Sequence, residues 1–130
     1  MEIINSLLYL RKAKRLLNKG RLDKLFALLN VYAKRHAPLS TPNKEDLDKV
    51  AHILDKACML YPTKTLCLAW AASFVMLLLK RGWRCQLLIG VQTLPFYAHA
   101  WVELNGKVIN DDPQLQERLA PIFCLNFEDK

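Results

Sequence analysis

Hydrophobic residues recur at helical spacing along the first third of the chain. Residues 2–18 and 21–36 are each expected to form a helix, and Gly20 between them can take the left-handed conformation that ends many helices. The second helix has one apolar stripe at three-to-four spacing, formed by Leu22, Leu25, Phe26, Leu29 and Ala33. The pattern therefore predicts a helical hairpin that packs one side against a core.

A third helix is expected from Thr41 to about Leu60. Thr41 suits the N-cap, Pro42 suits the first helical position, and Glu45 and Asp46 follow near the positive end of the helix dipole. The apolar positions keep the helical period and are Leu47, Val50, Ala51, Leu54, Ala57, Cys58 and Tyr61. This helix should also bury one face.

The longest apolar run, residues 66–79, predicts a helix that is covered on every side. Thr63 or Thr65 could cap its start, and Lys80-Arg81-Gly82 should end it. Its 14 residues are fewer than the roughly 20 that a membrane span needs. We therefore expect the central helix of the fold here, with Cys67 in its first turn.

Strands replace helices after Gly82. They are expected over residues 84–91, 96–104 and 107–110, followed by a short helical piece over 115–119 and a last strand over 122–127. Asn105-Gly106 is a strong hairpin signal, because both residues tolerate positive φ. Helices followed by antiparallel strands define an α+β fold. We expect a single domain over residues 1–130, with N-terminal helices (1–59) packed on a small antiparallel sheet.

Positive charge is concentrated at the start of the chain. The whole excess behind the net charge of +7 lies in residues 1–36, which hold nine Lys and Arg against Glu2 and Asp23. Such a segment can attract an acidic peptide, a nucleic acid or a membrane surface, although a solvated helix face is the simpler interpretation. A basic nucleic-acid-binding module is the non-enzymatic alternative. It is disfavoured, because the sequence has no aromatic-rich basic strand of the kind that stacks bases.

The cysteine pattern argues against a metal site, and no cofactor is expected. Cys58, Cys67, Cys85 and Cys124 form no CxxC pair, and no histidine lies near them at zinc-finger spacing. The first residues do not follow the signal-peptide pattern. We therefore expect free thiols in a soluble, cytoplasmic protein.

Cys67 and His99 are the strongest candidates for catalysis. Cys67 is placed at a predicted helix start, where unpaired backbone amides and the helix dipole stabilise a thiolate and can hold an oxyanion. The other three cysteines are expected to be buried and structural. His99 lies in a predicted strand between two alanines, which let another element approach closely. A cysteine at a helix start with a histidine on a strand is the general thiol-protease arrangement.

The third member of a triad should be a carboxylate near the hairpin strand, and Asp111 and Asp112 are the candidates. A strict two-residue turn at Asn105-Gly106 would place Asp112 opposite His99. A three-residue loop with a bulge would instead bring Asp111 to the face of His99. The residue pattern leaves both open, and one of the two aspartates is expected to serve only a turn.

Several of these segments, in this order, resemble a known family. They are Cys67-Leu68-Ala69 through Lys80-Arg81-Gly82, Leu88-Ile89-Gly90-Val91, Pro95-Phe96, Ala98-His99-Ala100-Trp101-Val102-Glu103, Gly106 and Asn110-Asp111. They are similar to the leader peptidases of lasso-peptide biosynthesis, the B2 half of a split B protein. The resemblance covers roughly residues 60–125, and residues 1–59 carry no comparable motif.

The resemblance implies a papain-like, transglutaminase-like fold and a Cys-His-Asp triad that removes the leader from a ribosomally made precursor peptide. Residues 60–127 would be the catalytic core, with Cys67 as nucleophile and His99 as general base and then acid. The family's interval between histidine and aspartate favours Asp111, since 111 − 99 = 12, with Asp112 as the reserve. The residues expected to contact the substrate are Phe96 and Trp101.

The resemblance also implies partners. In the family a leader-binding domain is fused to the protease or supplied as a separate small protein, and the segment before residue 60 has no room for it. We therefore expect the split form, acting with a separate leader-recognition (B1-type) protein, and the macrolactam-forming cyclase is a further candidate partner. A transglutaminase-type acyl transferase would use the same triad and pass the acyl group to an amine, so it is the alternative activity.

Overall fold

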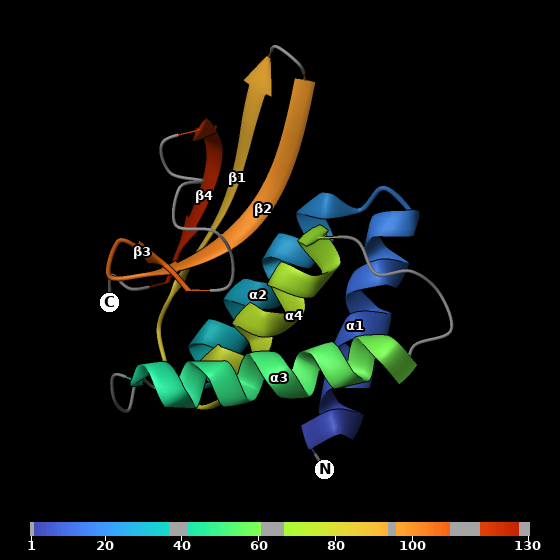
Figure 1. Ribbon diagram of the computed structural model, residues 1–130. Helices are drawn as coiled ribbons and strands as arrows, with labels where there is room; N and C mark the ends of the chain where they lie inside the picture. Colours follow the sequence, from blue (N-terminus) through green and yellow to red (C-terminus); the bar gives the residue numbers. More distant parts are fainter. Residues whose placement is uncertain (1, 37–41, 61–66, 94–95, 110–117, 128–130) are drawn as a thin grey trace.

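The computed structural model describes residues 2–36, 42–60, 67–93, 96–109 and 118–127, and these form four helices followed by a four-stranded sheet (Figure 1). The elements in chain order are α1 (Glu2–Asn18), α2 (Leu22–Arg35), α3 (Lys44–Leu60), α4 (Cys67–Lys80), β1 (Gln86–Thr93), β2 (Phe96–Leu104), β3 (Lys107–Val108) and β4 (Ala120–Asn126). The α+β class that the sequence predicts is confirmed.

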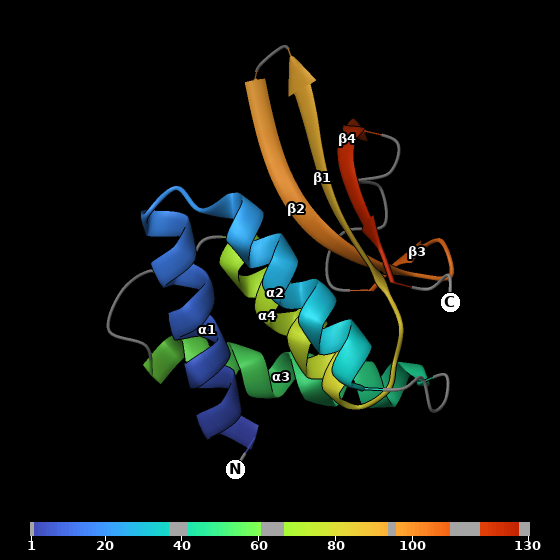
Figure 2. The same cartoon turned by 180° about the vertical axis from the view of Figure 1, so that it is seen from behind.

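Helix α4 is the central helix, as its composition predicts. All residues from Ala71 to Leu79 are buried, and α4 contacts the other three helices and β2. In two opposite views, α3 lies on one side of α4 and α2 on the other (Figure 1, Figure 2). None of the helices in the described ranges is long and apolar enough to cross a membrane.

Glycines end α1 and α4 as expected. Gly20 has a φ of 68°, and the N–H of Arg21 donates to the carbonyl of Leu16 at 2.8 Å, which closes the last turn of α1. Gly82 has a φ of 79° and ends α4 with the same hydrogen-bond pattern. The turn at Gly20 lets α2 fold back beside α1, as the hairpin prediction requires.

Helix α3 begins later than the expected cap at Thr41, which lies outside the described residues. Asn43 precedes the helix, and its side-chain Oδ1 accepts a hydrogen bond from the N–H of Asp46 at 2.8 Å. In return, Asp46 Oδ2 accepts one from the N–H of Asn43 at 3.2 Å. This reciprocal pair satisfies two amides that have no partner within the helix, so Asn43 is a better start signal than the Thr-Pro pair.

The sheet is antiparallel, with strand order β3-β2-β1-β4. β1 and β2 pair from Gln86 opposite Glu103 to Thr93 opposite Phe96. β4 pairs with the other edge of β1, with a register shift between Ile89 and Gly90. β1 begins later than expected and β4 begins earlier. The predicted helical piece over 115–119 falls largely on residues 110–117, which lie outside the described part.

The two faces of the sheet bury different residues. Leu87, Ala100 and Val102 belong to the main core with the helices. Leu88 and Trp101 form a second, smaller cluster with Leu119. Successive side chains of a strand point to opposite faces, so the cluster lies on the face turned away from the main core.

Arg84 ties the helical hairpin to the sheet. Its guanidinium Nη2 donates hydrogen bonds to the carbonyls of Ala33, at 2.9 Å, and His36, at 3.3 Å, at the end of α2. A cation at this position pairs carbonyls that lack helical partners and complements the negative end of the helix dipole. The segment that leads into β1 is therefore anchored on α2.

Candidate active site

Cys67 is the first residue of α4, and its side chain is exposed. The backbone amides of a first helical turn have no carbonyl partner within the helix. They and the helix dipole favour a thiolate at this position and can stabilise an oxyanion beside it. Because ten of the 14 residues of α4 are buried, the helix presents this thiol to solvent from a rigid support.

Trp70 lies one turn after Cys67, and the sequence pattern did not predict that it would fix this end of α4. Its Nε1–H donates a hydrogen bond to Asp55 Oδ1 on α3 at 2.9 Å. The centroid of its ring lies 5.0 Å from the centroid of the Phe74 ring. The bond ties the first turn of α4 to α3. An indole N–H in an otherwise apolar helix requires a polar partner, and that requirement is the signal available in the sequence.

His99 is half-buried and lies on β2, the strand on which α4 packs, with Gly90 opposite it on β1. Strand alternation places the His99 side chain on the face of Trp101, away from the face that packs on the helices. Among the described residues, β2 is paired with β3 only at Glu103 and Leu104, so the stretch with His99 forms the edge of the sheet. A contact between Cys67 and His99 would therefore form around this edge.

Trp101 is fully buried, and its expected contact with substrate stays a prediction. Its Nε1–H donates to Glu103 Oε2 at 2.8 Å, and Glu103 is itself buried. A Cβ at Gly90 would lie 2.6 Å from the Cη2 atom of the indole, so Gly90 leaves the space that the ring occupies. Trp101 therefore packs the face of the sheet that carries His99. The side chain of Phe96, the other predicted substrate contact, lies outside the described part.

The β2–β3 hairpin closes on a two-residue turn. Asn105 and Gly106 have φ values of 52° and 81°, and Leu104 pairs with Lys107. This is the primed turn that the Asn-Gly pair predicts. The bulged alternative is not present at the turn.

This turn bears on the two candidate aspartates, although both lie outside the described residues. The N–H of Ile109 donates to the carbonyl of Val102 at 3.0 Å, so the register of the turn persists to Ile109. The same register carried further would place Asp112 opposite His99, but β3 ends at Val108. Asp111, which the family interval favours, stays a prediction, as does Asp112.

All four cysteines lie in the described residues, and none of them forms a disulfide. Cys85 is buried and Cys58 packs against the main core, in agreement with a structural role. Cys124 is exposed, which corrects the expectation that it is buried. It lies on β4, an edge strand with exposed side chains along most of its length.

Comparison with known proteins places the chain in a class. The model of the transglutaminase-like superfamily matches residues 9–124, which is most of the chain, so the protein belongs to this superfamily. The match includes α2 and α3, for which the sequence pattern offered no family motif. No solved structure matches the chain.

The chain is also similar to a curated protein. The microcin J25-processing protein McjB of Escherichia coli is 42% identical to it over 59 residues. The matched stretch covers 45% of this chain and 28% of the relative, so the chain matches less than a third of the length of that protein.

Proposed function

We propose that the protein is a cysteine peptidase that removes the leader from a lasso-peptide precursor. Cys67 is the nucleophile, His99 the general base and then acid, and Asp111 the carboxylate that orients His99, with Asp112 as the alternative. The observation that carries the proposal is the exposed thiol at the first residue of the central helix in a transglutaminase-like chain. The strand with His99 packs on that same helix.

The chemistry follows from these roles. His99 takes the thiol proton of Cys67, and the sulfur attacks the carbonyl carbon of the scissile peptide bond. The amides of the first turn of α4 stabilise the oxyanion, and His99 then gives its proton to the leaving amine. Water, deprotonated by His99, hydrolyses the thioester, which releases the leader and returns the thiol.

The name of the relative supports a peptide substrate, because McjB is described as processing microcin J25. We propose that this protein acts with a separate leader-recognition protein and before a macrolactam-forming cyclase. Eight of the nine basic side chains of residues 1–36 are exposed, so α1 and α2 offer a basic surface to such a partner or to an acidic leader.

Mass spectrometry of the products tests the proposal. The protein is mixed with precursor peptides encoded beside its gene, with and without the leader-recognition protein, and with and without a primary amine. A peptidase yields leader and core masses that an added amine does not change. An acyl transferase yields one fragment whose mass is increased by the amine, because the thioester then transfers to nitrogen. Intact precursor in every mixture, with normally folded protein, would refute both activities.

A further inference from the structure

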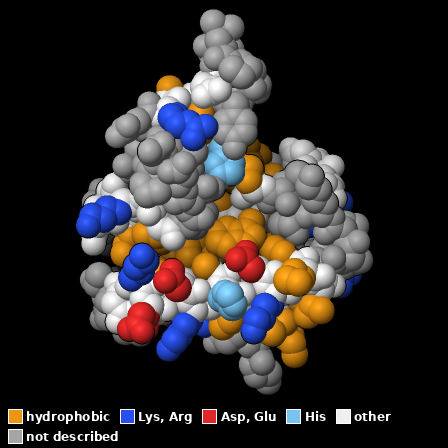
Figure 3. Space-filling model, viewed as in Figure 1, with side chains coloured by type: hydrophobic (Ala, Val, Ile, Leu, Met, Phe, Trp, Pro, Cys, Tyr) orange, Lys and Arg blue, Asp and Glu red, His pale blue; other side chains and the backbone are white. Residues whose placement is uncertain are grey.

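A groove lies between the β2–β3 hairpin and the start of α3, outside the residues assigned to the triad. Its volume is about 470 Å³. The residues that line it are Pro42, Lys44, Leu47, Asp48, Leu104, Asn105, Lys107, Val108 and Ile109. On this side of the molecule, hydrophobic side chains gather at the boundary between α3 and the sheet, above the charged outer surface of α3 (Figure 3).

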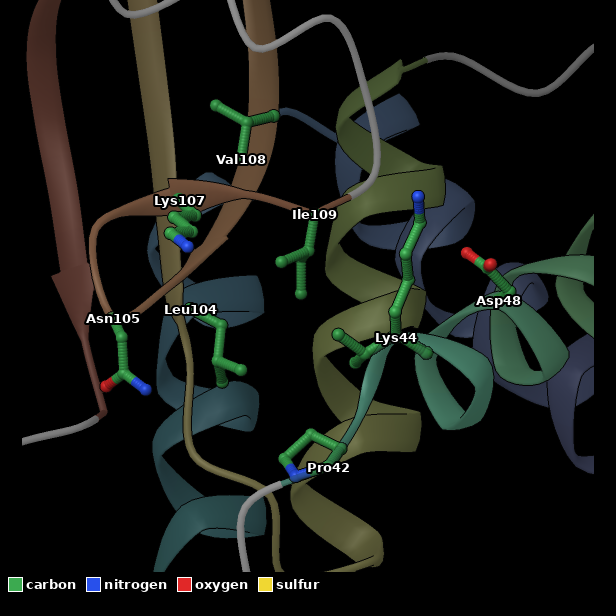
Figure 4. A pocket seen from close by; sticks show the side chains of 9 residues that line it. Pro42, Lys44, Asp48, Leu104, Asn105, Lys107, Val108 and Ile109 are labelled. Atoms are coloured by element: carbon green, nitrogen blue, oxygen red, sulfur yellow. The ribbon is translucent and has the colours of Figure 1, made fainter.

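The walls of the groove are apolar. Leu104 and Ile109 project from the hairpin towards α3, and both are partly exposed (Figure 4). Pro42 and Leu47 are buried and form the opposite wall. A cavity of this size with such walls accommodates one or two large apolar side chains.

Two cations flank this apolar space. Lys44 lies on the α3 side and Lys107 on the hairpin side, with their ammonium groups on either side of the gap (Figure 4). Both are exposed, and neither forms an ion pair with another described residue. Asp48 is the one acidic side chain of the lining, and its carboxylate lies beyond Lys44. The charge of the groove therefore suits a ligand that combines apolar side chains with carboxylates.

The groove lies along the same strand as the proposed catalytic base, His99. Leu104 lies five positions after His99 on the same strand. A strand rises about 3.3 Å per residue, so roughly 17 Å of rigid β2 separates them. The side chains of His99 and Leu104 point to opposite faces of β2, but the stretch of β2 with His99 is the edge of the sheet among the described residues. An extended peptide that follows this edge from a scissile bond at His99 would reach the groove about five residues away.

We propose that this groove binds an acidic, apolar segment of the substrate peptide, about five residues from the bond that is cut. The proposal rests on the peptidase function proposed above. The groove acts as a specificity site: leucine-like side chains enter between the hairpin wall of Leu104 and Ile109 and the opposite wall of Pro42 and Leu47, and flanking carboxylates pair with Lys44 and Lys107. The groove contributes to substrate binding and not to the chemical step.

Binding is measured without catalysis, on the Cys67→Ala variant, by fluorescence anisotropy. The probe is a fluorescein-labelled hexapeptide that alternates leucine and glutamate, and its matched controls alternate leucine with glutamine and serine with glutamate. The leucine–glutamate probe should bind about tenfold more tightly than either control, because each control lacks one of the two contacts. Equal binding of all three probes would overturn the proposal.

Charge variants locate the bound probe. Lys44→Glu with Lys107→Glu should weaken binding about tenfold or more, whereas Asp48→Asn should tighten it about threefold, since it removes the competing carboxylate. The control is Lys49→Glu with Lys56→Glu, which makes the same change in net charge at exposed positions of α3 outside the lining. A tighter Asp48→Asn variant cannot result from misfolding. Equal effects of the two double variants would show that only overall charge matters and would overturn the proposal.

Cleavage kinetics identify the occupant and separate this proposal from the peptidase function. In active protein, the Lys44 and Lys107 reversal should raise KM for the precursor about tenfold and leave kcat unchanged. An unchanged KM with weakened probe binding would show that the groove does not hold the substrate. If no precursor is cut although the probe binds, the proposed peptidase function is wrong, and so is the assignment of the groove to the substrate. The binding of acidic, apolar peptides by the groove would still be supported.

Discussion

The indole of Trp101 occupies the space that a side chain at Gly90 would need: a methyl group at residue 90 would lie 2.6 Å from Cη2 and 2.8 Å from Cζ3 of that ring. Because His99 is the strand partner of Gly90, the same contact lies beside the proposed catalytic base. The Gly90→Ala variant should lower the free energy of unfolding by about 1–3 kcal/mol, since overpacking displaces the buried ring. Urea denaturation measures this change.

A compensating change distinguishes overpacking from a loss of strand flexibility. Trp101→Phe removes the part of the ring that meets residue 90, so the double variant with Gly90→Ala should be more stable than the sum of the two single changes predicts. Simple additivity would show that the Gly90–Trp101 contact is not the cause.

Cys67→Ala should abolish cleavage and leave the fold intact, because the side chain is exposed at a helix start and contributes no core volume. His99→Ala should be as inactive, and the double variant no worse, since members of a triad act as a unit. Circular dichroism checks the fold, and product masses give the rate. Cys58→Ala is the matched control, and it should remain active. Equal loss of activity in the Cys58 and Cys67 variants would remove the special role of Cys67.

Asp111→Asn should lower turnover by orders of magnitude, and Asp112→Asn should have a much smaller effect. Only one carboxylate can accept a hydrogen bond from His99 in the orientation that catalysis needs, and the family interval favours Asp111. The kcat of each variant decides the assignment. The opposite ranking would show that the register of the two-residue turn at Asn105-Gly106 continues to residue 112.

The leader-recognition partner should lower the precursor concentration needed for cleavage, since it makes a second contact intramolecular and raises avidity by roughly 10²-fold. Changing Arg11, Lys12 and Arg15 to Glu should weaken this acceleration without altering the slow rate of the isolated protein. Lys14 is left unchanged, because it is only 9% exposed and its reversal would disturb packing.

The control for the partner experiment reverses three exposed lysines elsewhere, Lys49, Lys56 and Lys80. The dependence of the rate on precursor concentration is measured for each variant with and without the partner. Full-rate cleavage by the isolated protein at low precursor concentration would contradict partner dependence. Equal weakening by both triple variants would mean that net charge, and not the surface of α1, attracts the partner.

Arg84→Met should reduce the free energy of unfolding by about 1.5–3 kcal/mol, because it removes charge-assisted hydrogen bonds to two carbonyls at the end of α2. Arg35→Met, an exposed change of the same charge and similar size, should have little effect. Thermal and urea unfolding compare the two. A stable Arg84→Met protein would show that the helical hairpin is held by its apolar contacts alone.

Local signals predicted most of the fold, since the helix ends at Gly20 and Gly82 and the Asn105-Gly106 turn are set by neighbouring residues. The start of α3 was missed because Thr41-Pro42 and Asn43 with Asp46 are competing caps. For the candidate site, the pattern located Cys67 at its helix start. The burial of Trp101 was not predictable, because it depends on Leu119 and Gly90 from two other segments. Contacts of that kind are set by tertiary packing and not by periodicity.

The burial of α4 has a consequence for how the chain is made. Ten positions of this helix are buried, and most of the elements that contact it, α1, α2 and α3, come earlier in the sequence, whereas β1 and β2 come later. During synthesis these three helices leave the ribosome first, so a surface that can receive α4 exists before its most apolar stretch emerges. A shortened chain that begins just before Cys67 would expose that stretch and aggregate. Helices α1, α2 and α3 thus provide an apolar surface, synthesised before α4, on which the helix that carries Cys67 can pack.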